Sequence, residues 1–233
     1  MYLYLQKNIC MDFQVKFKVN EKVYLRDPEG SELGKRIVKS AIDLIYELGF
    51  ENFTFKKLAT EIQTTEATVY RYFESKHRLL LYILNWYWSY MEFLVAFQVQ
   101  NMKDPKQKIK AVVRLFTHEL PHSKGSHEYN KENLTQIVIN ESSKVYLVKD
   151  VDEINKNEVF KPYKDLCAAI AEIILEYNPK YKYPKSLGTT LIETSHHQQF
   201  FSKYLPKLTD VQVKNKDEYS AIFIEDLVFK ALS

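Results

Sequence analysis

The sequence predicts an all-α protein, with a small unit of three helices near the N-terminus and a larger helical body. Only five of its 233 residues are glycine, against a usual share of roughly 7%. Apolar residues recur at three- and four-residue spacing along most of the chain. Prolines stand at the ends of these periodic segments, where helices begin or stop. Together these observations predict about nine helices.

Composition limits the class of protein. With 45% hydrophobic residues, the chain can bury a sizeable core without disulfides. Cys10 and Cys167 are far apart and match no metal or redox spacing, so we interpret them as reduced thiols of a cytoplasmic protein. A net charge of +3 does not identify a partner, because one local basic patch is enough to bind nucleic acid.

Residues 1–29 are expected to form an N-terminal arm. Apolar and polar residues alternate from Phe13 to Val19, which is the period of a strand. A turn at Asn20 and a second strand from Lys22 to Arg26 would complete a short β-hairpin. Its lysines could enter a DNA minor groove. Alternatively, the apolar face of the arm packs on the protein and the lysines are solvated.

The first helix is predicted over residues 31–49. Ser31 is a favourable N-cap, and Glu32 in the first turn suits the helix dipole. Gly49 follows the last apolar position, as expected at a helix C-terminus.

Two short helices and one long helix follow. Thr54 begins a helix that ends at Ile62, and Thr65 caps another that runs to about Phe73. Ser75 then caps a long helix over residues 76–97. Its apolar stretch is long enough to span a membrane, but an acidic residue at mid-membrane costs roughly 2.5–3.5 kcal/mol, and Glu92 lies within it. We therefore expect a buried core helix and no membrane partner.

The later helices are located by prolines. Pro105 opens a helix that Pro121 closes, and Pro162 begins one that ends before Pro179. Pro184 precedes a helix that ends at Pro206, and the last helix covers about residues 217–231.

The second and third helices have the spacing of a helix-turn-helix, in which the second helix of the pair enters the DNA major groove. Val69 and Phe73 are four residues apart and should face the core, which turns Tyr70 and Arg71 outward. A phenol can donate to phosphate, and arginine can bind phosphate or guanine. The residues expected on or beside this surface are Thr54, Lys56, Lys57, Thr65, Glu66, Ala67, Thr68, Tyr70, Arg71 and Lys76.

The stretch FTFKKLATEIQTTEATVYRYFESKHRLL, residues 53–80, resembles the DNA-binding motif of the tetracycline-repressor (TetR) family. Gly49-Phe50, Leu58-Ala59, Thr68-Val69-Tyr70, Tyr72-Phe73 and Lys76 stand at the positions of that motif. By this resemblance, Thr54, Lys56, Thr65, Tyr70 and Lys76 would hold the phosphate backbone. Glu66, Ala67, Thr68 and Arg71 would face the bases.

Two residues depart from a simple DNA-reading helix. Gln63 stands where the family usually has a glycine, so it is expected to take positive φ at a modest strain cost. Glu66 repels phosphate but can accept a hydrogen bond from cytosine N4. Alternatively, Glu66 only interacts with the dipole of the third helix.

The resemblance implies a DNA-binding head over residues 30–76 and a regulatory and dimerisation body over residues 77–233. It further implies a transcriptional repressor that acts as a homodimer on a palindromic operator, with the last two long helices, about 186–205 and 216–231, at the dimer interface. A small-molecule effector is a further expected partner. Trp86, Tyr90 and Phe93 on the long fourth helix either line its pocket or are plain core.

No catalytic motif, metal-ligand spacing or cofactor signature stands out. His196 and His197 point about 100° apart on a helix, which suits no shared metal. We therefore expect no enzyme, no cofactor and no metal. The remaining alternatives are a family member without a small ligand and a helical partner-binding protein.

Overall fold

The computed structural model describes residues 16–118, 129–146, 148–149, 151–210 and 216–233. These residues are all-helical, as predicted, and contain no strand. They form eleven α-helices, against the expected nine or so. The helices that were not predicted lie between residues 131 and 156. Two of them have only four and six residues, too few to display a helical period.

The N-terminal unit consists of three helices: α1 (Glu32–Asn52), α2 (Phe55–Glu61) and α3 (Glu66–Tyr70). The predicted caps are confirmed, since the hydroxyls of Ser31, Thr54 and Thr65 each accept from a backbone N–H of the first turn. Gly49 has φ 74° and ψ 155°, so the regular part of α1 stops there, as expected for glycine at a C-terminus.

The body begins with α4 (Lys76–Val99), capped by Ser75, and α5 (Pro105–Thr117). It continues with α6 (Lys131–Glu141), α7 (Ser143–Tyr146) and α8 (Val151–Lys156). The last long helices are α9 (Lys161–Tyr177), α10 (Pro184–Tyr204) and α11 (Lys216–Leu232). Pro105, Pro162 and Pro184 stand in the first turns of α5, α9 and α10, as predicted.

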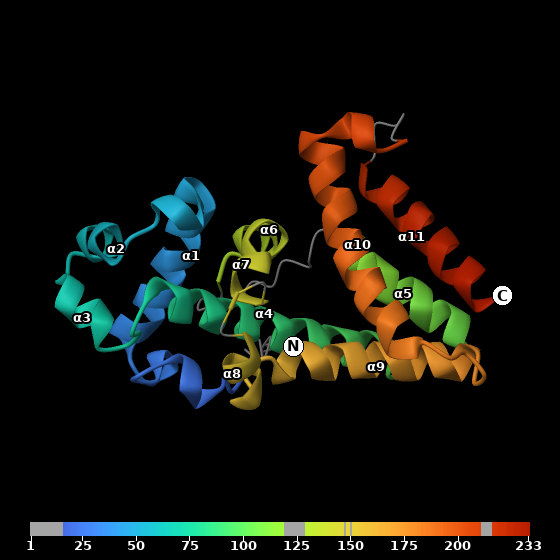
Figure 1. Ribbon diagram of the computed structural model, residues 1–233, viewed down its shortest axis with the longest axis horizontal. Coiled ribbons are helices and arrows are strands. Elements are labelled where there is room, and N and C mark those ends of the chain that lie inside the picture. Colours follow the sequence, from blue (N-terminus) through green and yellow to red (C-terminus); the bar gives the residue numbers. More distant parts are fainter. Residues whose placement is uncertain (1–15, 119–128, 147, 150, 211–215) are drawn as a thin grey trace, which may run out of the picture.

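These helices place the head and the last two helices at opposite ends of the molecule. In Figure 1, α2 and α3 lie at one end, and α10 and α11 at the other. Helices α4 and α9 run side by side through the body. Most of the apolar side chains of α4 are buried in the core, which agrees with a core helix. Among the described residues, no helix has the length and hydropathy needed to cross a membrane.

The predicted N-terminal hairpin is wrong for the residues described. Glu21–Val23 forms a 3₁₀ turn, η1, and a second one, η2, covers Pro28–Gly30. Asn20 caps η1 by accepting from the Lys22 N–H at 2.8 Å. Val19 and Val23 are buried, so core packing rather than strand pairing determines this segment. Phe13 and Val15 lie outside the described residues.

Candidate DNA interface

The turn between α2 and α3 has the geometry of a helix C-terminal cap. The Thr64 N–H donates to the Ala59 carbonyl at 2.8 Å, and the Gln63 N–H donates to the Thr60 carbonyl at 3.2 Å. This pair of bonds is a Schellman motif, which requires a left-handed residue between them. Gln63 is that residue, with φ 51°, as the sequence predicts. The turn therefore forms without glycine.

Helix α3 is anchored by its apolar side. Val69, Tyr72 and Phe73 are fully buried beneath it. The Tyr72 hydroxyl lies 2.8 Å from the Ser31 hydroxyl, which ties the end of this unit to the start of α1. This anchoring leaves the opposite side of α3 to solvent.

The outward side of α3 carries the side chains expected to read DNA. Glu66, Ala67, Tyr70 and Arg71 are exposed, and Thr68 is half-buried. The Tyr70 ring packs edge-on against Phe55 of α2, with centroids 4.9 Å apart, so its position is fixed although 47% of its surface is exposed. Thr54, Lys56 and Lys57 lie exposed on the adjoining α2. The structure thus brings the α2 and α3 members of the predicted set onto neighbouring helices.

The two threonine caps also use their side chains within the protein. The Thr54 hydroxyl accepts from the Lys57 N–H at 3.2 Å. The Thr65 hydroxyl accepts from the Thr68 N–H at 3.3 Å and lies 2.9 Å from the Thr68 hydroxyl. Each hydroxyl orders the first turn of a short helix. The Lys57 ammonium donates to the Asn52 carbonyl at 2.8 Å, beside the end of α1.

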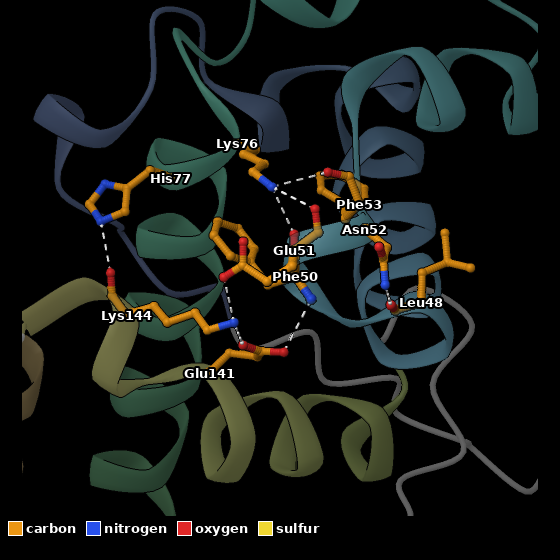
Figure 2. Close-up of polar contacts among 9 residues, drawn as sticks. All are labelled: Leu48, Phe50, Glu51, Asn52, Phe53, Lys76, His77, Glu141 and Lys144. Atoms are coloured by element: carbon orange, nitrogen blue, oxygen red, sulfur yellow. Dashed lines mark hydrogen bonds and ion pairs between the residues drawn. The ribbon is translucent and has the colours of Figure 1, made fainter.

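Lys76 makes its hydrogen bonds with the end of α1 and the residue that follows it. Its ammonium donates to the carbonyls of Phe50, Glu51 and Phe53 at 2.9, 3.1 and 3.4 Å, as Figure 2 shows. It also lies 4.7 Å from the centre of the Phe50 ring. A lysine has three N–H donors, and all of them have partners here. Its contacts are those of a side chain that joins α4 to the end of α1.

The aromatic side chains proposed for a pocket gather around Phe17. Trp86 and Tyr90 are buried and stacked, with centroids 5.5 Å apart, whereas Phe93 is 38% exposed. The centroid of the Phe17 ring lies 5.4 to 6.1 Å from the ring centroids of all three. The segment before α1 therefore covers this face of α4.

A second cluster in the body was not singled out from the sequence. The Glu193 carboxylate of α10 accepts from the Tyr163 hydroxyl at 2.5 Å and lies 3.4 Å from that of Tyr146. Burial, and the carboxylate beside it, raise the pKa of Tyr163. His196 follows one turn later, close to Trp88. Only the three-residue spacing of Glu193 and His196 could have indicated this pair, because their partners come from distant helices.

His196 is buried as a neutral side chain. Burial lowers its pKa to about 3, and its Nε2 atom has no hydrogen-bond partner. Its neighbours Trp88 and Phe116 are aromatic. Within the ranges that the structure describes, no three His, Cys, Asp or Glu side chains come together as a metal site. Cys167 is a buried free thiol, while Cys10 lies outside those ranges.

The three-helix head, its tight turn and the exposed third helix define a helix-turn-helix protein with a helical body. Residues 37–83 match the family described as bacterial regulatory proteins, tetR family. The head of this chain therefore carries the DNA-binding motif of that family. No curated protein sequence matches it.

Solved structures share the fold along most of their length. AibR in complex with isovaleryl coenzyme A and operator DNA is 17% identical, with a TM-score of 0.56 over 84% of this chain and 98% of AibR. A tetR-family regulatory protein from Rhodococcus RHA1 is 11% identical, with a TM-score of 0.60 over 87% of this chain and 98% of that protein. FadR from Bacillus subtilis in complex with stearoyl-CoA is 15% identical, with a TM-score of 0.58 over 84% of this chain and 97% of FadR.

Proposed function

We propose that this protein is a sequence-specific DNA-binding transcriptional regulator that represses its target by occupying a palindromic operator. The observation that carries the proposal is the outward side of α3. There Ala67, Tyr70 and Arg71 are exposed, while the opposite side of the helix is anchored in the core. Thr68 and Arg71 are proposed to read bases, with Glu66 and Ala67 beside them. Thr54, Lys56, Lys57, Thr65 and Tyr70 are proposed to hold phosphates.

We propose a homodimer for this function. A single α3 of five residues reaches few base pairs. A dimer with two-fold symmetry would place two such helices on the DNA, which doubles the number of base pairs contacted and makes the operator palindromic. Helices α10 and α11 are suited to the interface because they lie at the end opposite the head. Exposed apolar side chains in this region include Tyr204, Leu205, Leu208 and Ile222, and such side chains commonly mark contact surfaces.

The first test is a selection from random duplexes at two salt concentrations, followed by sequencing of the retained DNA. The proposal expects an enriched palindrome whose affinity falls steeply with salt, because phosphate contacts release counterions. Size-exclusion chromatography with light scattering should give a dimer. Retention of no duplex at either salt concentration would favour the alternative of a partner-binding helical protein.

We also propose that a small molecule binds in the body and changes the affinity for DNA. Two similar proteins were solved with isovaleryl coenzyme A and stearoyl-CoA, so acyl-CoA thioesters are the first compounds to test. Trp86 and Trp88 are the only tryptophans of the chain, and both lie on α4. Their fluorescence should therefore respond to a ligand in the body. If no thioester changes it, the alternative of a regulator without such a ligand gains weight.

A further inference from the structure

We infer that Glu141, at the end of α6, is a positioning residue that fixes the orientation of the DNA-binding head relative to the body. The inference rests on the proposed function and adds to it the contact through which the body controls the head. The joint, residues 50–53, consists of the end of α1 after Gly49 and the residue that links it to α2, and it leads directly into the helix-turn-helix.

Backbone groups of the joint bond to side chains of α4 and α6. α1 is interrupted at Gly49, and the next N–H, that of Phe50, donates to Glu141 Oε1 at 3.1 Å. The bond is buried, and only 8% of Glu141 is exposed. The carbonyls of the same joint accept from Lys76, as described above. Figure 2 shows the joint held between Lys76 of α4 and Glu141 of α6.

Lys144 extends this contact as a bridge between two carboxylates. Its ammonium lies 2.8 Å from Glu141 Oε2, as an ion pair, and 2.8 Å from Glu51 Oε1. Burial opposes the charge of Lys144, but the bonds to Glu141 and Glu51 outweigh it and raise its pKa. The His77 ring lies 3.2 Å from the Lys144 carbonyl. Removing one partner of a buried carboxylate strongly destabilises a protein. The bond of Glu141 to the Phe50 N–H and its ion pair with Lys144 therefore depend on each other.

Other contacts between the head and the body come from the same part of the chain. Asn133 of α6 donates to Asp43 of α1 at 2.8 Å. Tyr129, just before α6, donates at 2.7 Å to Glu29 in η2, the turn that precedes α1. A movement of α6 would therefore reach α1 at several points. Glu141 is the point nearest the helix-turn-helix, because Thr54, the cap of α2, follows the joint.

The contact also continues into the body. Ser142 follows Glu141, and its hydroxyl lies 3.1 Å from that of Tyr146. The Tyr146 hydroxyl in turn lies 3.4 Å from Glu193 of α10. A change at α10, through a ligand or through the dimer, thus has a route of direct contacts to the joint.

The test uses the full-length protein and an operator obtained from the duplex selection, at a temperature where circular dichroism shows every variant folded. The variants are E141Q, E141A, K144M and the double variant E141Q/K144M. N140A is the matched control, because Asn140 is the exposed neighbour of Glu141 on α6. Duplex affinity is measured by fluorescence anisotropy, and amide hydrogen exchange is measured on peptides that cover residues 49–53 and α9.

We expect E141Q to lower operator affinity about tenfold, within the usual range of coupling between sites, because a loosened head must be ordered on DNA. The number of phosphate contacts stays the same, so the salt dependence should not change. K144M should lower operator affinity less than E141Q does. The loss of binding free energy in the double variant should be smaller than the sum of the two single losses. In E141A, amide exchange at residues 49–53 should accelerate, while exchange in α9 should be unchanged. In N140A, exchange in both segments should equal that of the wild type.

A rise in affinity of the same size would also support the positioning role, with the fixed head as the form of low affinity. Unchanged affinity and unchanged exchange in E141A and E141Q would overturn the inference. The exchange measurement needs no DNA. If the wild-type protein selects no duplex, the proposed function fails while the role of Glu141 at the joint is still tested.

Discussion

The ammonium of Lys76 lies 2.9 Å from the carbonyl oxygen of Phe50, which connects the start of α4 to the end of α1. Two further carbonyls of the same joint accept from this ammonium. Resemblance to the TetR motif implies that Lys76 holds the phosphate backbone, and in the structure all three of its donors have partners within the protein. We therefore propose that Lys76 supports DNA binding by ordering the head.

Replacing Lys76 with alanine should lower the free energy of unfolding by about 1.5–3 kcal/mol, because a charged donor to partly buried carbonyls is removed. Affinity for all duplexes should fall, but its salt dependence should stay unchanged. A phosphate contact would instead reduce the salt slope by about one. Urea denaturation and DNA titration at several salt concentrations separate the two roles, with Lys56→Ala as the control for an exposed lysine of the head.

Substitutions on the exposed side of α3 should separate affinity from specificity. Arg71→Ala and Thr68→Val should change the preferred sequence, because a side chain that reads a base edge discriminates against the wrong base by about 1–3 kcal/mol. Tyr70→Phe should weaken binding to all sequences alike, because it removes a donor to phosphate. The measurement is duplex selection repeated with each variant. An unchanged operator in both Arg71→Ala and Thr68→Val would contradict the proposed base-reading role.

Replacing Gln63 with glycine should stabilise the protein by about 0.5–1 kcal/mol. Gln63 holds φ 51°, a region that glycine occupies without a steric penalty. Gln63→Ala serves as the control, since alanine keeps the penalty and should leave stability nearly unchanged. Thermal and urea denaturation would measure both variants, and a destabilised glycine variant would contradict the strain assignment.

His196 should make stability depend on pH. Its folded pKa of about 3 lies below the unfolded value of roughly 6.5, so the unfolded state binds a proton first as the pH falls. The stabilisation is complete above pH 6.5 and declines between 6.5 and 3. From pH 7.5 to 5 the decrease should be about 2 kcal/mol. Replacing His196 with leucine should remove this part of the pH dependence in urea denaturation, whereas His197→Leu should not.

Much of the head could be predicted because its signals are local. Ser31, Thr54, Thr65 and Ser75 are caps whose partners lie three residues away, and the positive φ of Gln63 follows from the helix that it ends. The hairpin prediction was wrong because alternation alone cannot distinguish a strand from a segment whose apolar residues pack on a core. Val19 and Val23 are buried around a 3₁₀ turn.

The sequence by itself determined the helical class and the head motif, since caps, periodicity and motif spacing depend on residues close together in the chain. Only the tertiary structure brought Lys76 and Glu141 to the joint at the end of α1. The Phe50 N–H meets Glu141 across 91 positions of sequence, and Glu193 meets Tyr146 across 47. Such partners are chosen by how the helices pack, because a buried polar group must find a partner wherever packing places one.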